Sequence, residues 1–255
     1  MIKRCLVLMA AAIASTASAA DVPAIAAAAD LNYALPQVAE AFLRDTGKRV
    51  RIAFGSSGNF AQQIENGAPF ELYLAADEAY VQRLVNKGLT RDAGALYAIG
   101  RLVLFVPEGS PLLPDATLQD LRKSIDDGRL RRFAIANPEH APYGRAARTA
   151  LQAARVWEAI EPHLVLGENA AQAMQFAAAG AQGGIVPYAL VLAPAVARRG
   201  TAVLLPESSH PPLRQRMVLL KRAGVTAEAF HHYLQQPKAR EILVRLGFAL
   251  PPDAR

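Results

Sequence analysis

Hydrophobic positions recur along this chain with two periods, one typical of buried strands and one typical of helices that bury a single face. Short apolar runs alternate with stretches in which apolar residues recur every three or four positions. In the first part of the chain the expected strands are 22–29, 50–54 and 72–75, and the expected helices are 30–43, 59–65 and 78–87. Strands that alternate with helices predict a mostly parallel, doubly wound sheet of the α/β class.

A second unit of the same kind follows a segment that proline and glycine interrupt. The run 102–106 is predicted as a strand that leaves the first unit, and the candidate strands 203–205 and 217–220 flank the return. Between them the expected strands are 133–136, 164–166 and 184–186, and the expected helices are 118–125, 144–154 and 170–179. Two further helices are expected near 227–235 and 238–246.

This order of elements predicts two lobes. The first lobe is expected to comprise residues 21–103 and 214–255, and the second is expected to comprise residues 104–213. In both lobes helices flank the sheet. Extended crossings between the lobes place a ligand cleft between the carboxyl ends of the two sets of strands.

Residues 1–20 have the pattern of a secretory signal peptide. Lys3 and Arg4 precede an apolar run at 6–13 that is too short to span a bilayer, and small residues lead to a cleavage site after residue 19 or 20. Cys5 is the only cysteine, and it lies before the apolar run, so it cannot be the acylated cysteine of a lipoprotein. We therefore expect a soluble periplasmic protein.

Composition and charge exclude several classes of protein. The chain has 255 residues, of which 52% are hydrophobic, so a sizeable core is expected and disorder is excluded. It has 28 basic and 22 acidic residues, and removal of Lys3 and Arg4 with the signal peptide leaves 26 against 22, or a charge of +4. The basic residues are scattered and no aromatic residues interleave with them, so we expect no nucleic-acid partner.

Candidate chemistry lies in the loops between strands and helices, where helix N–H groups are unpaired and small residues let a ligand come close. Loops of this form occur at 29–30, 55–59, 142–144 and 169–170. Each of these loops alone is weak evidence for a ligand site. A sequence such as Gly55-Ser56-Ser57-Gly58, for example, is more often a simple tight turn. Their recurrence in both predicted lobes indicates helix N-termini that converge on a small anion.

An ordered set of short segments spreads over almost the whole mature chain. Its most specific members are the run 63–77 and the sequence Pro-Glu-His-Ala-Pro at 138–142. The full set is 26–31, 54–59, 63–70, 75–78, 137–144 and 184–188. Together these segments resemble the substrate-binding proteins of molybdate ABC transporters.

The resemblance implies a type II periplasmic-binding-protein fold whose two lobes close on molybdate or tungstate and deliver it to a membrane permease. It implies no catalytic activity and no cofactor, and we expect a monomer. In the family pattern, neutral donors hold the oxyanion, here Ser57, Ala170 and Tyr188. The positions that match the family's ligand contacts are Asp30, Ser57, Tyr143, Ala170, Pro187 and Tyr188.

Three of these positions depart from the family pattern. Asp30 stands in place of a serine, Tyr143 in place of a small residue, and Pro187 in place of a tyrosine, which follows one position later as Tyr188. Tyr143 is as compatible with packing between the lobes as with ligand contact. Ser57 keeps the family's residue, and Ala170 can still contribute its backbone N–H.

Asp30 is the departure with the largest electrostatic consequence. A carboxylate 4 Å from one unit charge of the same sign costs about 4 kcal/mol at an effective dielectric near 20, and roughly twice that against a dianion. Either its side chain caps the following helix at the N–H of Asn32 or Tyr33, or the ligand carries a proton or a positive group that an acid can receive. We expect the first, because capping is the usual role of Asp before a helical run.

Two alternatives to an oxyanion-binding protein stay open. One is a binding protein of the same fold for another small ligand that accepts the Asp30 carboxylate. The other is a secreted serine hydrolase, since Ser57, His140 and Asp77 supply the residue types of a triad. No Gly-x-Ser-x-Gly elbow surrounds Ser57, and Asp77 precedes a helical run as a cap would, so we expect no enzyme.

Overall fold

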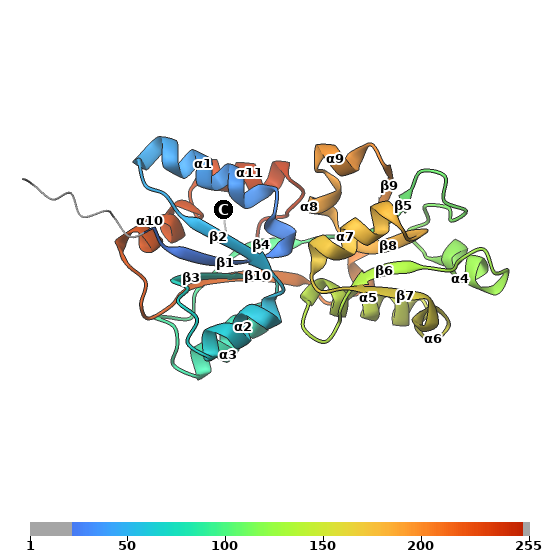
Figure 1. The fold of residues 1–255 in the computed structure, drawn as a ribbon, viewed down its shortest axis with the longest axis horizontal. Coiled ribbons are helices and arrows are strands. Elements are labelled where there is room, and N and C mark those ends of the chain that lie inside the picture. The colour runs from blue at the N-terminus through green and yellow to red at the C-terminus, as the bar shows by residue number, and fades with distance from the viewer. Residues whose placement is uncertain (1–21, 252–255) are drawn as a thin grey trace, which may run out of the picture.

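Two separate five-stranded sheets form the frame of this protein, and helices cover both faces of each sheet (Figure 1). The structure is a computed structural model and describes residues 22–251. The strand order of the first sheet is β2-β1-β3-β10-β4, and that of the second sheet is β7-β6-β8-β5-β9. The strands are β1 Ala24–Ala28, β2 Arg51–Gly55, β3 Leu72–Ala75, β4 Ala95–Gly100, β5 Leu102–Pro107, β6 Phe133–Ala136, β7 Leu164–Gly167, β8 Gly183–Pro187, β9 Gly200–Leu204 and β10 Leu213–Leu219.

Both sheets are mixed but mostly parallel, as expected, because four of the five strands in each sheet run in one direction and one runs against them. In each lobe three strands are parallel, β2-β1-β3 and β7-β6-β8, and one longer strand beside them is antiparallel to both of its neighbours. These antiparallel strands, β10 and β5, are the ones that enter their sheet directly from the other lobe. No crossover helix turns them around, so they pair in the opposite direction. The two-lobed α/β fold itself is confirmed.

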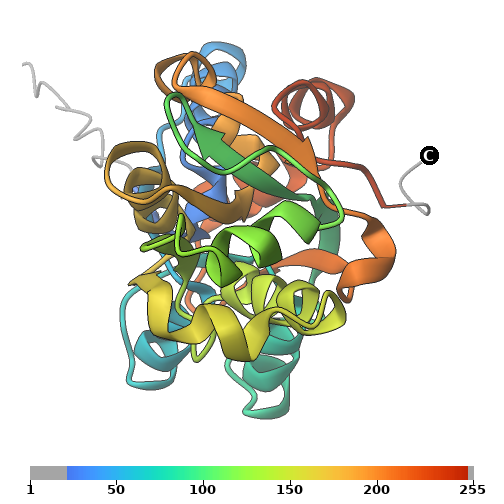
Figure 2. The ribbon, with the colours of Figure 1, turned by 90° about the vertical axis from the view of Figure 1, so that its right-hand side faces the viewer.

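The chain passes between the sheets at two places. Arg101 alone separates β4 from β5, and residues 205–212 lead from β9 back to β10. The strands therefore change sheet two residues before the boundary expected between 103 and 104. Figure 2 looks onto the second lobe, where β5 and β9 lie side by side. The strand β4 was missed, because its apolar residues continue across Arg101 into β5.

Helices sandwich each sheet. In Figure 1, α1, α10 and α11 lie above the first sheet and α2 and α3 lie below it, while α7, α8 and α9 lie above the second sheet and α5 and α6 lie below it. The helices are α1 Ala34–Thr46, α2 Ser57–Glu65, α3 Glu78–Asn86, α4 Gln119–Asp126, α5 Pro142–Ala153, α6 Trp157–Ile160, α7 Ala170–Ala179, α8 Tyr188–Val191, α9 Pro194–Ala197, α10 Val225–Tyr233 and α11 Pro237–Arg245. The short 3-10 helices are η1 Ala29–Leu31, η2 Glu161–His163 and η3 Glu207–Ser209.

The strand β1 shows why the sequences of the central strands are unbroken apolar runs. Ile25 and Ala27 pack with α1, α10 and α11 on one face of the sheet, and Ala26 packs with α2 and α3 on the other. A strand that is buried on both faces has no polar positions to alternate with its apolar ones. Its carboxyl end leads directly into η1, so the first functional loop is anchored in the core of the lobe.

Two further points concern the expected signal peptide and membrane-spanning helices. The signal peptide expected at residues 1–20 lies outside the described residues. Between residues 22 and 251, none of the helices has the length and apolar character needed to cross a membrane.

Glu65 ties the helix that begins at Ser57 to the neighbouring helix. Its side chain is 7% exposed, and its carboxylate oxygens lie 2.5 Å from Arg83 Nε and 2.9 Å from Lys87 Nζ. The hydrogen bond from Arg83 is the main reason that the pKa of Glu65 falls to about 2. Because this pKa is lower in the folded than in the unfolded state, the ionised carboxylate stabilises the fold at neutral pH.

We expect Glu65→Gln to lower the free energy of unfolding at pH 7 by roughly 1–3 kcal/mol, as for the loss of a charged hydrogen bond. The difference from the wild type should shrink as the pH falls from the ordinary value of 4.5 towards 2, where the wild-type carboxyl group also becomes neutral. Urea denaturation between pH 7 and pH 3 measures this difference. Glu40→Gln is the control, because its exposed pair with Arg44 should contribute little. An equal effect of both variants would contradict this account.

Candidate functional site

A small cavity lies where the two lobes meet. It is bounded by the carboxyl ends of β1, β2 and β3 and by the first residues of α2, α5 and α7. From the first lobe it is lined by Ala28, Ala29, Asp30, Gly55, Ser56, Ser57 and Ala76, and from the second by Ala141, Pro142, Tyr143 and Ala170. No lysine, arginine or histidine is among these lining residues.

The N-termini of three helices meet at this cavity. Ser56 caps α2 by accepting a hydrogen bond from the N–H of Asn59 at 3.2 Å, so this helix starts two residues earlier than predicted. Asn169 caps α7 by accepting from the N–H groups of Ala171 and Gln172, and leaves Ala170 at the cavity wall. The first N–H groups of a helix have no partner within the helix, and they carry the positive end of its dipole. The cavity is therefore lined by donors and is suited to an anion.

The hydroxyl group of Ser57 is held in one orientation. Its Oγ accepts a hydrogen bond from the N–H of Ala76 at 3.0 Å, and its carbonyl accepts one from the Tyr73 hydroxyl at 2.7 Å. Ser57 is fully buried. Because the Ala76 N–H already occupies a lone pair of Oγ, the hydroxyl proton is free to be donated to a molecule in the cavity.

Asp30 lies in η1 and is 1% exposed. Its Oδ2 accepts a hydrogen bond from Gln215 Nε2 at 2.5 Å, and its Oδ1 has no hydrogen-bond partner. Burial raises the pKa of Asp30 to about 6, against the opposite effect of hydrogen bonding by Gln215 and Tyr143. The predicted N-cap role is wrong, because α1 begins only at Ala34 and the carboxyl group is bound by Gln215.

Gln215 connects Asp30 to two tyrosines. Its Nε2 donates to the Tyr143 hydroxyl at 3.2 Å, and its Oε1 accepts from the Tyr97 hydroxyl at 2.7 Å. A side chain at Gly100 would place its Cβ 2.3 Å from the Tyr143 hydroxyl and 2.9 Å from Gln215 Nε2, so only glycine leaves room for this arrangement. We call Asp30, Gln215, Tyr97 and Tyr143 the buried polar network. Sequence reasoning missed Gln215 and Gly100, since nothing near them in the chain indicates these contacts.

Direct contacts hold the two lobes together beside the cavity. The N–H of Gly58 donates to the carbonyl of His140 at 2.9 Å, and the His140 ring nitrogen Nδ1 lies 3.0 Å from Ser56 Oγ. Arg145 forms an ion pair with Asp77 at 2.5 Å, and its guanidinium group stacks on the ring of Tyr80. The structure thus shows the lobes in a closed arrangement.

These contacts do not assemble a hydrolytic triad. His140 contacts Ser56 rather than Ser57. Asp77 caps α3 by accepting from the N–H of Ala79, as the sequence predicts, and its other oxygen binds Arg145. A triad needs the acid to orient the histidine and the histidine to accept the serine proton.

The structure brings four of the six predicted ligand residues, Asp30, Ser57, Tyr143 and Ala170, around this cavity. Pro187 and Tyr188 lie outside its lining. Pro187 ends β8 opposite Leu102, and the Tyr188 ring lies under the guanidinium group of Arg101. This contact places Tyr188 at the crossing between the lobes. Ligand contact by each of the six residues stays a prediction.

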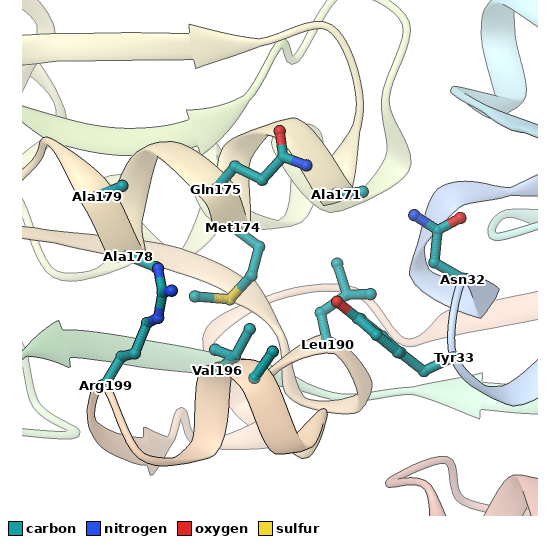
Figure 3. Close-up of a pocket in the computed structure, with 11 residues that line it drawn as sticks. Asn32, Tyr33, Ala171, Met174, Gln175, Ala178, Ala179, Leu190, Val196 and Arg199 are labelled. Carbon is teal, nitrogen blue, oxygen red and sulfur yellow. The ribbon is translucent and has the colours of Figure 1, made fainter.

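A larger hollow lies between α7, α8, α9 and the segment after η1. Figure 3 shows Met174 and Val196 on one side of it and Tyr33 on the other. Its lining is mainly aliphatic, with Arg199 as its charged side chain. Residues near the starts of α1, α7 and α9 are in its lining, but no carboxyl end of a strand contributes to it, so we favour the small cavity as the site for an anion.

Comparisons with known proteins agree with this fold and with the two-lobed cleft. The family described as bacterial extracellular solute-binding protein matches residues 24–249. The chain is 35% identical to the molybdate-binding protein ModA of Rhodobacter capsulatus, covering 92% of this chain and 91% of that protein. It is 36% identical to the protein of the same name from Azotobacter vinelandii, covering 93% of each.

Solved structures extend the comparison to three dimensions. The periplasmic molybdate-binding protein of Azotobacter vinelandii superimposes with a TM-score of 0.80 at 30% identity, covering 90% of this chain and 99% of that one. The sulfate-binding protein SubI of Mycobacterium tuberculosis shares the fold, with a TM-score of 0.71 at 17% identity. The chain belongs to the bacterial extracellular solute-binding protein family.

Proposed function

We propose that this protein captures molybdate or tungstate in the cavity between its lobes and delivers the anion to the membrane permease of an ABC importer. The observation that carries this proposal is a cavity between the two lobes that is lined by helix N-termini and hydroxyl groups and has no cationic side chain among its lining residues. The names of the relatives from Rhodobacter and Azotobacter support the choice of molybdate. The sequence pattern of residues 1–20 supports export to the periplasm, where a monomer would meet its permease.

Neutral donors suit a tetrahedral oxyanion that carries no proton. Such an anion offers only acceptor oxygens, so each of its contacts must come from an N–H or O–H group. The hydroxyl and backbone N–H groups of Ser57 and the backbone N–H of Ala170 supply such donors from the two lobes. Because no cationic side chain lines the cavity, no buried cation is left unpaired when the lobes close in the absence of ligand.

One observation favours a second candidate ligand. Oδ1 of Asp30 lacks a partner, and an ionised carboxylate there would accept a hydrogen bond from an O–H or N–H group of a ligand. Hydrogen phosphate and small organic cations belong to this class. They remain the alternative to a fully deprotonated oxyanion.

A thermal-shift series with molybdate, tungstate, sulfate, phosphate and small organic cations tests the proposed function. A ligand at 100 times its Kd stabilises the native state by about 2.7 kcal/mol, which raises the melting temperature by several degrees. We expect this rise with molybdate and tungstate and a smaller one with sulfate. A rise with phosphate or a cation alone would favour the second candidate.

Ser57→Ala removes a hydroxyl donor from the cavity wall. A hydrogen bond to a charged ligand contributes roughly 1.5–3 kcal/mol, so the variant should bind molybdate about one to two orders of magnitude more weakly. Ser124→Ala is a matched control, because Ser124 is also fully buried but lies in α4 of the second lobe. Isothermal titration calorimetry measures both affinities. Equal affinity of Ser57→Ala and wild type would remove Ser57 from the site.

Gly58→Ala tests whether closure of the lobes is part of binding. An added Cβ would lie 2.6 Å from the His140 carbonyl oxygen across the lobe interface. Overpacking of this kind typically costs about 1–3 kcal/mol, so we expect affinity for molybdate to fall about 5- to 150-fold. In Gly180→Ala, the control, the added Cβ meets nothing within 4 Å. Small-angle scattering should show less compaction by ligand in Gly58→Ala than in Gly180→Ala, and equal compaction and affinity would refute the closure model.

A further inference from the structure

The cavity proposed to hold a dianion contains a buried acid. Asp30 is the carboxylic acid among the lining residues, it is 1% exposed, and its Oδ1 has no partner in the described structure. An ionised carboxylate at this place would repel the ligand proposed above. The question that follows is which group holds a proton when the cavity is filled.

Resting on that proposed function, we propose that Asp30 binds the oxyanion as the neutral acid and donates a hydrogen bond from Oδ1, so that capture of each dianion takes up one proton. The proton comes from solution, is held on the Asp30 carboxyl group while the anion is bound, and returns to solution on release. No covalent bond to the ligand forms or breaks.

The buried polar network determines which oxygen carries the proton. In the orientation of the amide that the structure shows, Oε1 of Gln215 accepts a hydrogen bond from the Tyr97 hydroxyl at 2.7 Å. Nε2 of Gln215 therefore faces Asp30 and donates to Oδ2 at 2.5 Å. In a neutral carboxyl group the carbonyl oxygen is the better acceptor, so Oδ2, which accepts from this amide, is assigned as the carbonyl oxygen. The proton is assigned to Oδ1, the oxygen that lacks a partner.

The surroundings of Asp30 offer no cation that would keep it ionised. Tyr97 from β4 and Tyr143 from α5 are the titratable side chains that face it, and Gln215 from β10 is neutral. Three elements pack against η1, namely α7, α8 and β2. Helix α7 carries no ionisable side chain, and Tyr188 on α8 lies against Arg101. Arg51 on β2 is exposed at the other end of that strand.

Burial already moves the acid towards its neutral form. The pKa of Asp30 is raised to about 6 by burial in the closed protein without ligand, and a dianion in contact would raise it further. Affinity should therefore be nearly constant below about pH 6. Above that pH it should fall about tenfold per unit, because a proton must be taken up before the anion can be bound.

Isothermal titration calorimetry with molybdate between pH 6 and pH 8.5 tests this inference. Repeating the titration at pH 7.5 in buffers of different ionisation enthalpy measures proton uptake, for which we expect a value near one per molybdate. Asp30→Asn keeps an amide donor and an acceptor for Gln215, and it should bind with little dependence on pH and no proton uptake. Ser57→Ala should bind more weakly at every pH while its slope with pH stays unchanged.

A second titratable group near the site requires its own control. His140 lies 3.0 Å from Ser56, and His140→Gln should keep the slope with pH if Asp30 is the group responsible. Tight molybdate binding by the wild type without proton uptake would overturn the inference and leave the proposed function intact, and so would loss of the slope in His140→Gln alone. Failure of the wild type to bind molybdate or tungstate at every pH would overturn both.

Discussion

A carboxyl group buried between two lobes constrains the rest of this structure, because burying an acid in an apolar interior is costly unless it is hydrogen-bonded or neutral. Asp30 meets that constraint through Gln215, which lies 185 positions later in the chain. The same amide reaches Tyr143 in the second lobe, so the side chain of Gln215 connects η1, β10 and α5 beside the cavity. Because residue 100 is a glycine, the Tyr143 hydroxyl and the Gln215 amide have room beside it.

The fold places the donors of the cleft by simple means. Parallel strands present their carboxyl ends at one edge of a sheet, and each strand there leads into the N-terminus of a helix. The chain crosses between the two sheets into the antiparallel strands β5 and β10, and residues of both lobes line the same cavity. Two direct contacts between the lobes stabilise the closed arrangement. They are the hydrogen bond between Gly58 and His140 and the ion pair between Arg145 and Asp77.

Local patterns predicted most of the secondary structure. The bounds of β3, β6 and α7 agree with the prediction, because an apolar run between turn residues, or an Asn cap before a helical run, is a signal contained in adjacent residues. The loops that carry Ser57 and Ala170 followed from the same signals. The family resemblance added the expectation of a binding cleft, which the membership now supports.

Contacts between distant residues were beyond that reasoning. Asp30 precedes a helical run like a cap, but its tertiary bond to Gln215 prevails over the local preference. Gln215 stands between Arg214 and Arg216, before the strand predicted at 217–220, and yet it is fully buried in β10. The mixed character of the sheets depends on which strands cross between lobes, and strand direction leaves no mark in the local sequence.

The most direct test of this account is the position of the metal atom in a crystal of the protein grown with molybdate or tungstate, located from its anomalous scattering. The account predicts a single strong peak in the small cavity between Ser57 and Ala170, with a ligand oxygen within hydrogen-bonding distance of Asp30 Oδ1. A peak in the larger hollow beside Met174 and Arg199, with the small cavity empty, would contradict it.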